Sequence, residues 1–228
     1  VSSETLFDQT SPGVATLASG GFVVVWESQY SSDDGSGYAV KAQVYRADGL
    51  ADGEEFLVNT ATTGAQQAPG ITALAGGGFV ITWQSADGGK DDSDTGIKAQ
   101  IFDADGAAVG DEFLVNTEIA DGQSAPGITA LTGGGFVVTW QSEDGEDPSG
   151  TGIKAQIYDA SGNTVGVELL INTETRGEQT VPDVAALADG GFVVTWASDN
   201  GLTDQDDTDG SDIKAQIYDA SGNEVGEE

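Results

Sequence analysis

Aspartate residues gather in four loops of the chain, and carboxylates at this density favour cation binding. Each loop runs from a Ser that follows a Trp to a Lys that precedes Ala-Gln, and the four interiors contain 12, 12, 11 and 15 residues. The fourth loop is the richest, with Asp at nearly alternate positions before Gly210. Calcium takes about six to eight oxygen ligands, which a flexible Gly-containing loop of this composition can supply.

The candidate ligands share the position or the neighbourhood of one recurring Asp, which lies seven residues before the Lys in every loop. The predicted calcium ligands are Asp34, Asp87, Asp91, Asp94, Asp144, Asp147, Asp204, Asp206, Asp207, Asp209 and Asp212. Asp and Gly also form good turns, and a solvated acidic rim would keep a secreted protein soluble. Calcium in at least one loop and a solvated rim therefore both stay open, and no loop has the complete EF-hand pattern.

The overall charge narrows the range of partners. Lys and Arg number 7 against 39 Asp and Glu, which gives a formal net charge of -32. Coulomb repulsion would oppose binding to nucleic-acid phosphate or to an anionic membrane surface. No apolar run approaches the roughly 20 residues that span a bilayer. We expect calcium as a partner, and neither nucleic-acid binding nor membrane insertion.

The missing residue types also bear on catalysis. The chain has no Cys, no His and no Met, which removes thiolate chemistry and the usual general base. Glycosidases use a pair of carboxylates, but a catalytic pair should be unique to one site, and these acids recur fourfold. We therefore predict that the chain is not an enzyme.

A fourfold repeat must position these loops. The four Trp residues of the chain, at 26, 83, 140 and 196, are spaced 57, 57 and 56 residues apart. Each follows a Gly-Gly-Phe-Val run, and one Gln and one Pro recur before each of these runs. The repeat covers residues 1–228 as one domain of four units of about 57 residues.

Short apolar runs separated by Gly, Asp and Asn predict strands. In the second unit we expect strands over Ile71–Leu74, Phe79–Gln84, Ile97–Phe102 and Glu112–Asn116. Four strands per unit around a central aromatic residue predict an all-β, four-bladed β-propeller, with an open stack of β units as the alternative. Core packing is the favoured role of the recurring Trp, ahead of a platform for sugars.

The ends of the chain fall in one strand of the repeat. Val1-Ser2-Ser3 aligns with Val58-Asn59-Thr60, and Glu227-Glu228 aligns with Glu54-Glu55. We expect the N-terminal segment to complete the last sheet, either within one copy or between copies joined head to tail.

The repeat unit resembles a known group of modules. Gly-Gly-Phe-Val-Val-Thr-Trp-Gln-Ser, an Asp-Gly loop and Ile-Lys-Ala-Gln-Ile-Tyr-Asp-Ala-Ser-Gly-Asn are similar to repeats of very large secreted bacterial calcium-binding proteins of the RTX and adhesin type. The resemblance covers essentially the whole chain and implies an extracellular, calcium-rich location on a bacterial surface. The chain lacks the tandem Gly-Gly-x-Gly-x-Asp nonapeptides of the RTX pattern.

Two functions follow from these observations. The first is a calcium-stabilised, non-enzymatic module for adhesion or surface structure, which assembles with other copies of itself. The second is a lectin-like propeller that binds cell-surface glycan through the variable acidic loops.

Overall fold

The computed structural model describes residues 2–3, 7–29, 37–86, 95–117, 122–143, 150–173, 175, 177–199 and 210–228. These residues form four antiparallel sheets of four strands each, which we call blades 1 to 4 in chain order. The all-β, four-bladed fold of propeller type is therefore confirmed. Within the described ranges, no helix is long and apolar enough to cross a membrane.

The strands of each blade neighbour one another in sequence order. Blade 1 contains β1 (Gln9–Thr16), β2 (Phe22–Gln29), β3 (Tyr38–Tyr45) and β4 (Ala51–Leu57). Blade 2 contains β5 (Gln66–Ala73), β6 (Phe79–Ser85), β7 (Gly96–Phe102) and β8 (Ala108–Leu114). Blade 3 contains β9 (Gln123–Ala130), β10 (Phe136–Ser142), β11 (Gly152–Tyr158) and β12 (Thr164–Leu170). Blade 4 contains β13 (Gln179–Ala186), β14 (Phe192–Ser198), β15 (Asp212–Tyr218) and β16 (Glu224–Val225).

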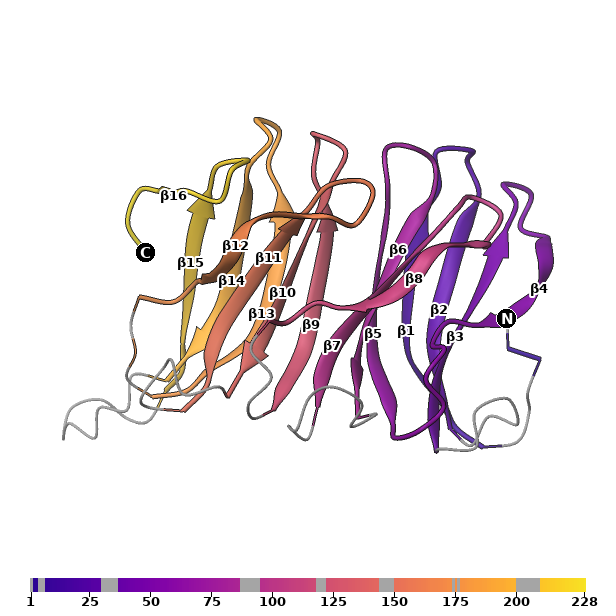
Figure 1. The fold of residues 1–228 in the computed structure, drawn as a ribbon, viewed down its shortest axis with the longest axis horizontal. Helices are drawn as coiled ribbons and strands as arrows, with labels where there is room; N and C mark the ends of the chain where they lie inside the picture. Colours follow the sequence, from indigo (N-terminus) through magenta and orange to yellow (C-terminus); the bar gives the residue numbers. More distant parts are fainter. Residues whose placement is uncertain are drawn as a thin grey trace.

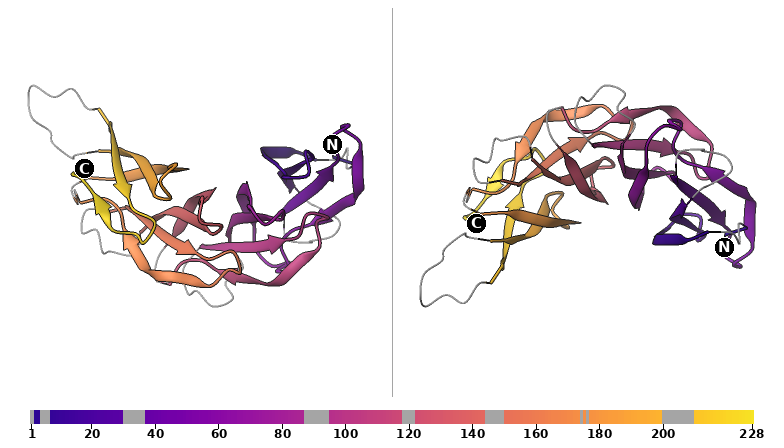
Figure 2. Two further views of the ribbon diagram at one scale, coloured as in Figure 1. Left: turned by 90° about the horizontal axis from the view of Figure 1, so that it is seen from above. Right: turned by 90° about the horizontal axis from the view of Figure 1, so that it is seen from below.

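The blades stand side by side along an open arc (Figure 1), with the two chain ends at opposite ends of that arc (Figure 2). The first strand of each blade lies on the concave side and the fourth strand on the convex side. Within this single copy the N-terminal segment lies far from the last sheet, so only completion between copies stays a prediction. The Ser3 N–H instead donates to Glu55 at 2.8 Å, in blade 1, and β16 pairs with β15.

The hairpin between the first two strands explains the repeated Gly-Gly pair. In blade 3, Gly134 has a φ of 98°, which the tight turn requires and which a side chain would strain. A Cβ on Gly135 would lie 2.1 Å from the carbonyl oxygen of Tyr158, so the third strand passes too close for any side chain. The pair therefore turns the chain and lets β10 begin directly against β11.

A bulge in the first strand corrects one of the predicted boundaries. In blade 2 the pairing register jumps between Gln67 and Gly70, so that Ala68 and Pro69 together oppose a single residue of β6. Because a bulge needs no ladder donor at this point, the Pro is accommodated inside the strand. The predicted start at Ile71 is therefore five residues late, and β5 begins at Gln66.

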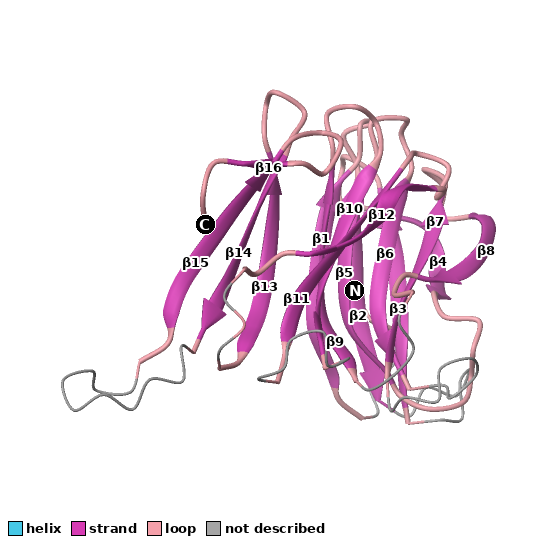
Figure 3. Ribbon diagram, turned by 60° about the vertical axis from the view of Figure 1, so that its left-hand side comes forward, coloured by secondary structure: helices cyan, strands magenta, loops and turns pink. Residues whose placement is uncertain are grey.

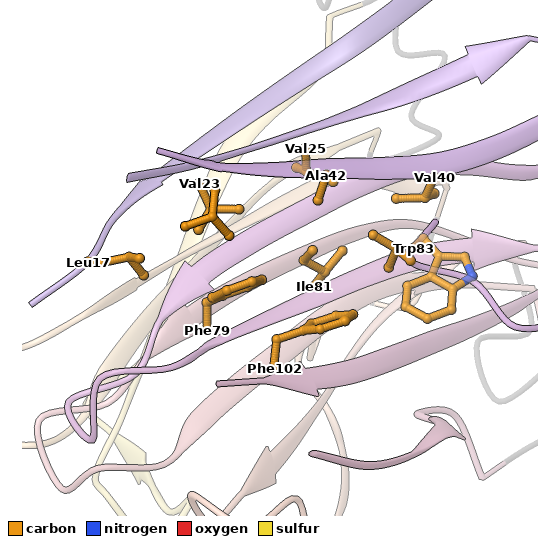
Figure 4. Packing of buried hydrophobic residues seen from close by; sticks show 11 residues of the cluster. Leu17, Val23, Val25, Val40, Ala42, Phe79, Ile81, Trp83 and Phe102 are labelled. Carbon is orange, nitrogen blue, oxygen red and sulfur yellow. The ribbon is translucent and has the colours of Figure 1, made fainter. Parts of the chain in front are cut away.

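Blades pack on each other through two different faces (Figure 4). We call the face of blade 1 that carries Val23, Val25, Val40, Ala42 and Val44 its aliphatic face, and the face of blade 2 that carries Phe79, Ile81, Trp83 and Phe102 its aromatic face. These two faces form one buried cluster. The same pairing joins blade 2 to blade 3 and blade 3 to blade 4, so the core of the protein lies between the sheets.

The first strands of neighbouring blades approach closely on the concave side. A Cβ on Gly70 would lie 3.7 Å from the carbonyl oxygen of Pro126, and one on Gly127 would lie 3.6 Å from that of Pro182. In blade 4 the same repeat position holds Asp183.

Candidate functional site

The blades have two distinct ends, which Figure 3 shows from the side. The hairpin turns gather at one end, and the second and third strands of each blade run to the other end, which we call the loop end. The acidic loops connect these two strands and therefore belong to the loop end. The predicted ligands Asp34, Asp87, Asp91, Asp94, Asp144, Asp147, Asp204, Asp206, Asp207 and Asp209 lie outside the described residues. The remaining predicted ligand, Asp212, is the exposed first residue of β15.

A hydrogen-bonded Trp–Gln pair joins the first two strands of each blade. The indole N–H of Trp83 donates to Oε1 of Gln66 at 2.9 Å, and Trp140 bonds Gln123 at the same distance. The equivalent bonds in blades 1 and 4 are also 2.9 Å long. Each indole is at most 3% exposed, which confirms that the Trp residues are core and not a surface platform for sugars.

Buried hydroxyl groups occur at the base of three loops. Ser85, Ser142 and Ser198 each end the second strand of their blade and are at most 2% exposed. Within the part of the chain that the structure describes, their Oγ atoms have no hydrogen-bond partner. A buried unpaired hydroxyl is unfavourable, so these atoms offer a donor and an acceptor to water or to a group held by the loop.

Few acidic side chains at the loop end belong to the described residues. Glu143 follows β10, and its backbone N–H donates to the carbonyl of Gly122 at 3.0 Å. Asp199 follows β14, and its N–H donates to the carbonyl of Glu178 at 2.8 Å. Among the described ranges, no group of three acidic side chains is arranged to hold a metal ion. The described residues therefore supply the frame of the loop end but no assembled calcium site.

Each of the four equivalent Lys side chains forms an ion pair with a Glu of its own blade. Lys98 Nζ lies 2.9 Å from Oε1 of Glu112, and Oε2 of the same carboxylate accepts the backbone N–H of Thr60 at 2.7 Å. Burial raises the pKa of Glu112, but the hydrogen bonds from Thr60 and Lys98 outweigh it and the net pKa is lowered. The carboxylate thus joins blade 2 to the segment that leaves blade 1.

The same clamp recurs along the arc. Lys41, Lys154 and Lys214 pair with Glu55, Glu168 and Glu228 at 3.2, 2.9 and 2.9 Å. The backbone N–H groups of Ser3, Thr117 and Thr173 donate to these three carboxylates. Because three of these four clamps connect consecutive blades, the clamp is a structural element of the array.

One buried carboxylate breaks the fourfold pattern. Glu27 in β2 is 7% exposed, and its two oxygens accept the Ala68 N–H at 2.6 Å and the Thr10 hydroxyl at 3.0 Å. The equivalent positions hold Gln84, Gln141 and Ala197, so the aligned repeats alone already distinguish Glu27. Both oxygens are occupied, so Glu27 ties β2 to the bulge of β5.

Two hollows among the described residues lie away from the loop end. One, of about 460 Å³, sits among the hairpin turns of blades 3 and 4 and is lined by Leu131, Thr132, Tyr158, Asp159, Val165 and Asp189. A second, of about 430 Å³, follows the outer edge of blade 3 beside Lys154, Val167 and Glu168. Both volumes fall within the range of roughly 300–1,000 Å³ that is typical of small-molecule pockets.

Comparison with known proteins identifies the fold. No protein-family model matches the chain, and no curated protein sequence matches it. A protein of unknown function from Dyadobacter fermentans is 14% identical over 96% of this chain and 68% of its own, with a TM-score of 0.63. The Hadza microbial sialidase Hz136 is 12% identical over 94% of this chain and 45% of its own, with a TM-score of 0.64. An α-L-arabinanase from Penicillium chrysogenum, complexed with arabinobiose, is 15% identical over 95% of this chain and 59% of its own, with a TM-score of 0.62.

These likenesses correct one expectation. The sequence predicts that the chain is not an enzyme. That prediction is wrong, because glycoside hydrolases share the propeller fold of this chain. The absence of His and Cys does not exclude that chemistry, since glycoside hydrolysis needs two carboxylates. At this level of identity the likeness shows the fold alone, and the chain spans less than half of the sialidase and less than two thirds of the arabinanase.

Proposed function

We propose that this chain is a carbohydrate-binding propeller module whose ligand contacts lie in the variable loops of the loop end. The observation that carries the proposal is the match of nearly the whole chain to propellers that act on carbohydrate, among them the sialidase and the arabinanase. A binding function that resides in loops on a constant frame is the usual arrangement for such folds.

The composition of the loops supports this choice. Sugar hydroxyls are donors and acceptors, and carboxylate and hydroxyl groups match both roles. The four loops differ in length and sequence while the strands around them repeat, so the loops carry what distinguishes one blade from another. The buried Ser85, Ser142 and Ser198 hydroxyls add polar groups at the base of three loops.

Calcium is part of the proposal. Carboxylates gathered in one loop repel each other, and an oxygen-seeking cation would relieve that repulsion and fix the loop conformation. We assign this role to the Asp residues predicted above, the fourth loop being the richest in them. An extracellular location at a bacterial surface is also part of the proposal, because the repeat unit resembles those of secreted calcium-binding proteins.

A role in adhesion or in a surface matrix is the second candidate. The observation that favours it is the uniform clamp and face packing between consecutive units, which suits a load-bearing array. The two candidates differ in whether a soluble sugar binds.

A glycan array in calcium and in EGTA tests the proposed function. We expect calcium-dependent binding to at least one class of glycan. Each glycan that binds is then incubated with the protein and analysed for cleavage. Binding without cleavage supports a lectin-like module, and cleavage supports a carbohydrate-active enzyme. The absence of glycan binding under both conditions contradicts the proposal and leaves the structural role.

A further inference from the structure

The arc ends in two faces that are buried everywhere else in the molecule. Each internal interface consists of the aliphatic face of one blade on the aromatic face of the next. Blade 4 therefore presents an aliphatic face at the C-terminal end of the arc, and blade 1 presents an aromatic face at the N-terminal end (Figure 2). The two end faces are the two halves of an interface that the chain already forms three times.

The aliphatic end face is markedly exposed. Ile213 is 78% exposed, although its counterparts Val40, Ile97 and Ile153 are all 0% exposed. Ile217 is 42% exposed, whereas its counterpart in blade 3, Ile157, is 3% exposed. Large apolar side chains at this exposure, side by side on one sheet face, mark an interaction surface.

The aromatic end face shows a loss of burial at Val14, Phe22 and Tyr45, whereas Trp26 on the same face is only 3% exposed. Val14 is 64% exposed, whereas the equivalent Val184 is 8% exposed against blade 3. Phe22 and Tyr45 stack on each other at 4.8 Å between ring centres and are only partly buried. Their counterparts in blade 4, Phe192 and Tyr218, are 0% and 2% exposed.

We propose that a second copy of this chain docks head to tail, with the aromatic face of its blade 1 on the aliphatic face of blade 4. The internal interfaces define the geometry, because most repeat positions of the two end faces, Asp183 excepted, hold the same residue types as the internal faces. Such a contact is heterologous, so each docked copy leaves a free face at both ends and growth continues until the arc closes or a filament forms. The inference does not depend on sugar binding, because strand residues of β1, β2, β3 and β15 make the proposed contact.

The N-terminal segment fits this arrangement. Ser3 makes the same contact with Glu55 that Thr60 makes with Glu112, so residues 2–3 occupy the place of a segment that leaves a preceding blade. Asn59 directly precedes Thr60, and its Oδ1 accepts the Val40 N–H of blade 1 at 2.9 Å. A docked copy therefore brings Ser2, the counterpart of Asn59, towards Ile213, the counterpart of Val40.

One residue of the end face opposes docking. Asp183 stands where Gly13, Gly70 and Gly127 allow the first strands of neighbouring blades to approach. Its carboxylate accepts the N–H of Val184 at 2.8 Å and would face the first strand of the docked copy. The net charge of -32 also repels copies, so docking should strengthen with salt, which screens exposed charges beyond about 8 Å at physiological ionic strength.

Sedimentation velocity of residues 1–228 across a wide concentration range tests the proposal. Wild type should self-associate, and Ile213→Glu and Val14→Glu should each weaken the association at least about tenfold by placing a charge in an apolar contact. Val167→Glu is the matched control, because Val167 is 77% exposed on β12 and belongs to neither end face. All three side chains are exposed, so unfolding curves should show native stability in every variant.

A mixing experiment identifies the mode of contact. Ile213→Glu keeps an intact aromatic face and Val14→Glu keeps an intact aliphatic face, so an equimolar mixture should form dimers that grow no further. Asp183→Gly should tighten the association of the wild-type chain by about tenfold, since it restores the close approach seen inside the arc. A wild-type chain that stays monomeric in high salt, or an Ile213→Glu chain that associates like wild type, overturns the proposal.

Discussion

At the scale of single residues, the paired Trp and Gln side chains decide the stability of each blade. Trp140 is 0% exposed, and its indole N–H is the hydrogen-bond partner of Gln123, which is also fully buried. The ring belongs to the cluster between blades 2 and 3, so it fills an interface as well as a sheet.

We predict that Trp140→Ala lowers the free energy of unfolding by about 3–5 kcal/mol, because it leaves a cavity and an unpaired amide. Trp140→Phe should cost less, roughly 1–3 kcal/mol, because it mainly removes the hydrogen bond. Urea unfolding followed by circular dichroism measures both. An alanine variant with native stability would contradict the core role of the Trp.

The clamp carboxylates predict a specific response to acid. The pKa of Glu112 lies below its usual value, so its contribution to stability is complete above the unfolded-state pKa near 4.5 and is lost as the pH falls through the lower folded-state pKa. Glu112→Gln should cost about 1–3 kcal/mol at pH 7, because Lys98 loses its charged partner.

The difference between wild type and Glu112→Gln should therefore shrink below pH 4.5. Comparing the two proteins at each pH is necessary, because protonation also relieves the repulsion among 39 acidic residues and stabilises both. A difference that stays constant down to the acid transition would show that the carboxylate is not the titrating group.

At the scale of the elements, the calcium sites proposed in the acidic loops predict a response of the melting temperature to calcium. If free calcium exceeds the dissociation constant about 100-fold, each site stabilises the folded chain by about 2.7 kcal/mol. We predict a higher melting temperature in calcium than in EGTA, measured by scanning calorimetry with sodium chloride added to match ionic strength. Identical melting curves would contradict a calcium site in the loops.

The elements also show how far the sequence determines the structure. The recurring Trp, Phe and Gly-Gly predict four sheets, because strand period and turn chemistry are local. The bulge at Ala68–Pro69 is not predicted, since a Pro ordinarily argues against a strand. Only the pairing of Gln66 and Gln67 with β6 shows that β5 begins before the Pro. Glu27 is missed because its role depends on Ala68, a residue of the next blade.

At the scale of the whole molecule, the open arc follows from how blades pack and not from the strand pattern. A closed ring and an open arc of four units have the same repeat, so the repeat alone cannot choose between them. The arc is set by the alternating aliphatic and aromatic faces and by the close approach of Gly70 and Gly127 to the next blade. The sequence cannot predict the geometry of the candidate site for the same reason. The distances between carboxylates of separate loops depend on how the blades pack.

The measurement that tests the proposed function most directly is a glycan array with two proteins, wild type and a variant with Asn at all eleven predicted loop ligands. The substitutions remove charge at constant size, so the buried Trp residues should keep their fluorescence and the variant should fold. We predict that wild type binds at least one class of glycan in calcium and that the variant binds none. Equal binding by both proteins, or binding by neither, would contradict a carbohydrate site in the acidic loops.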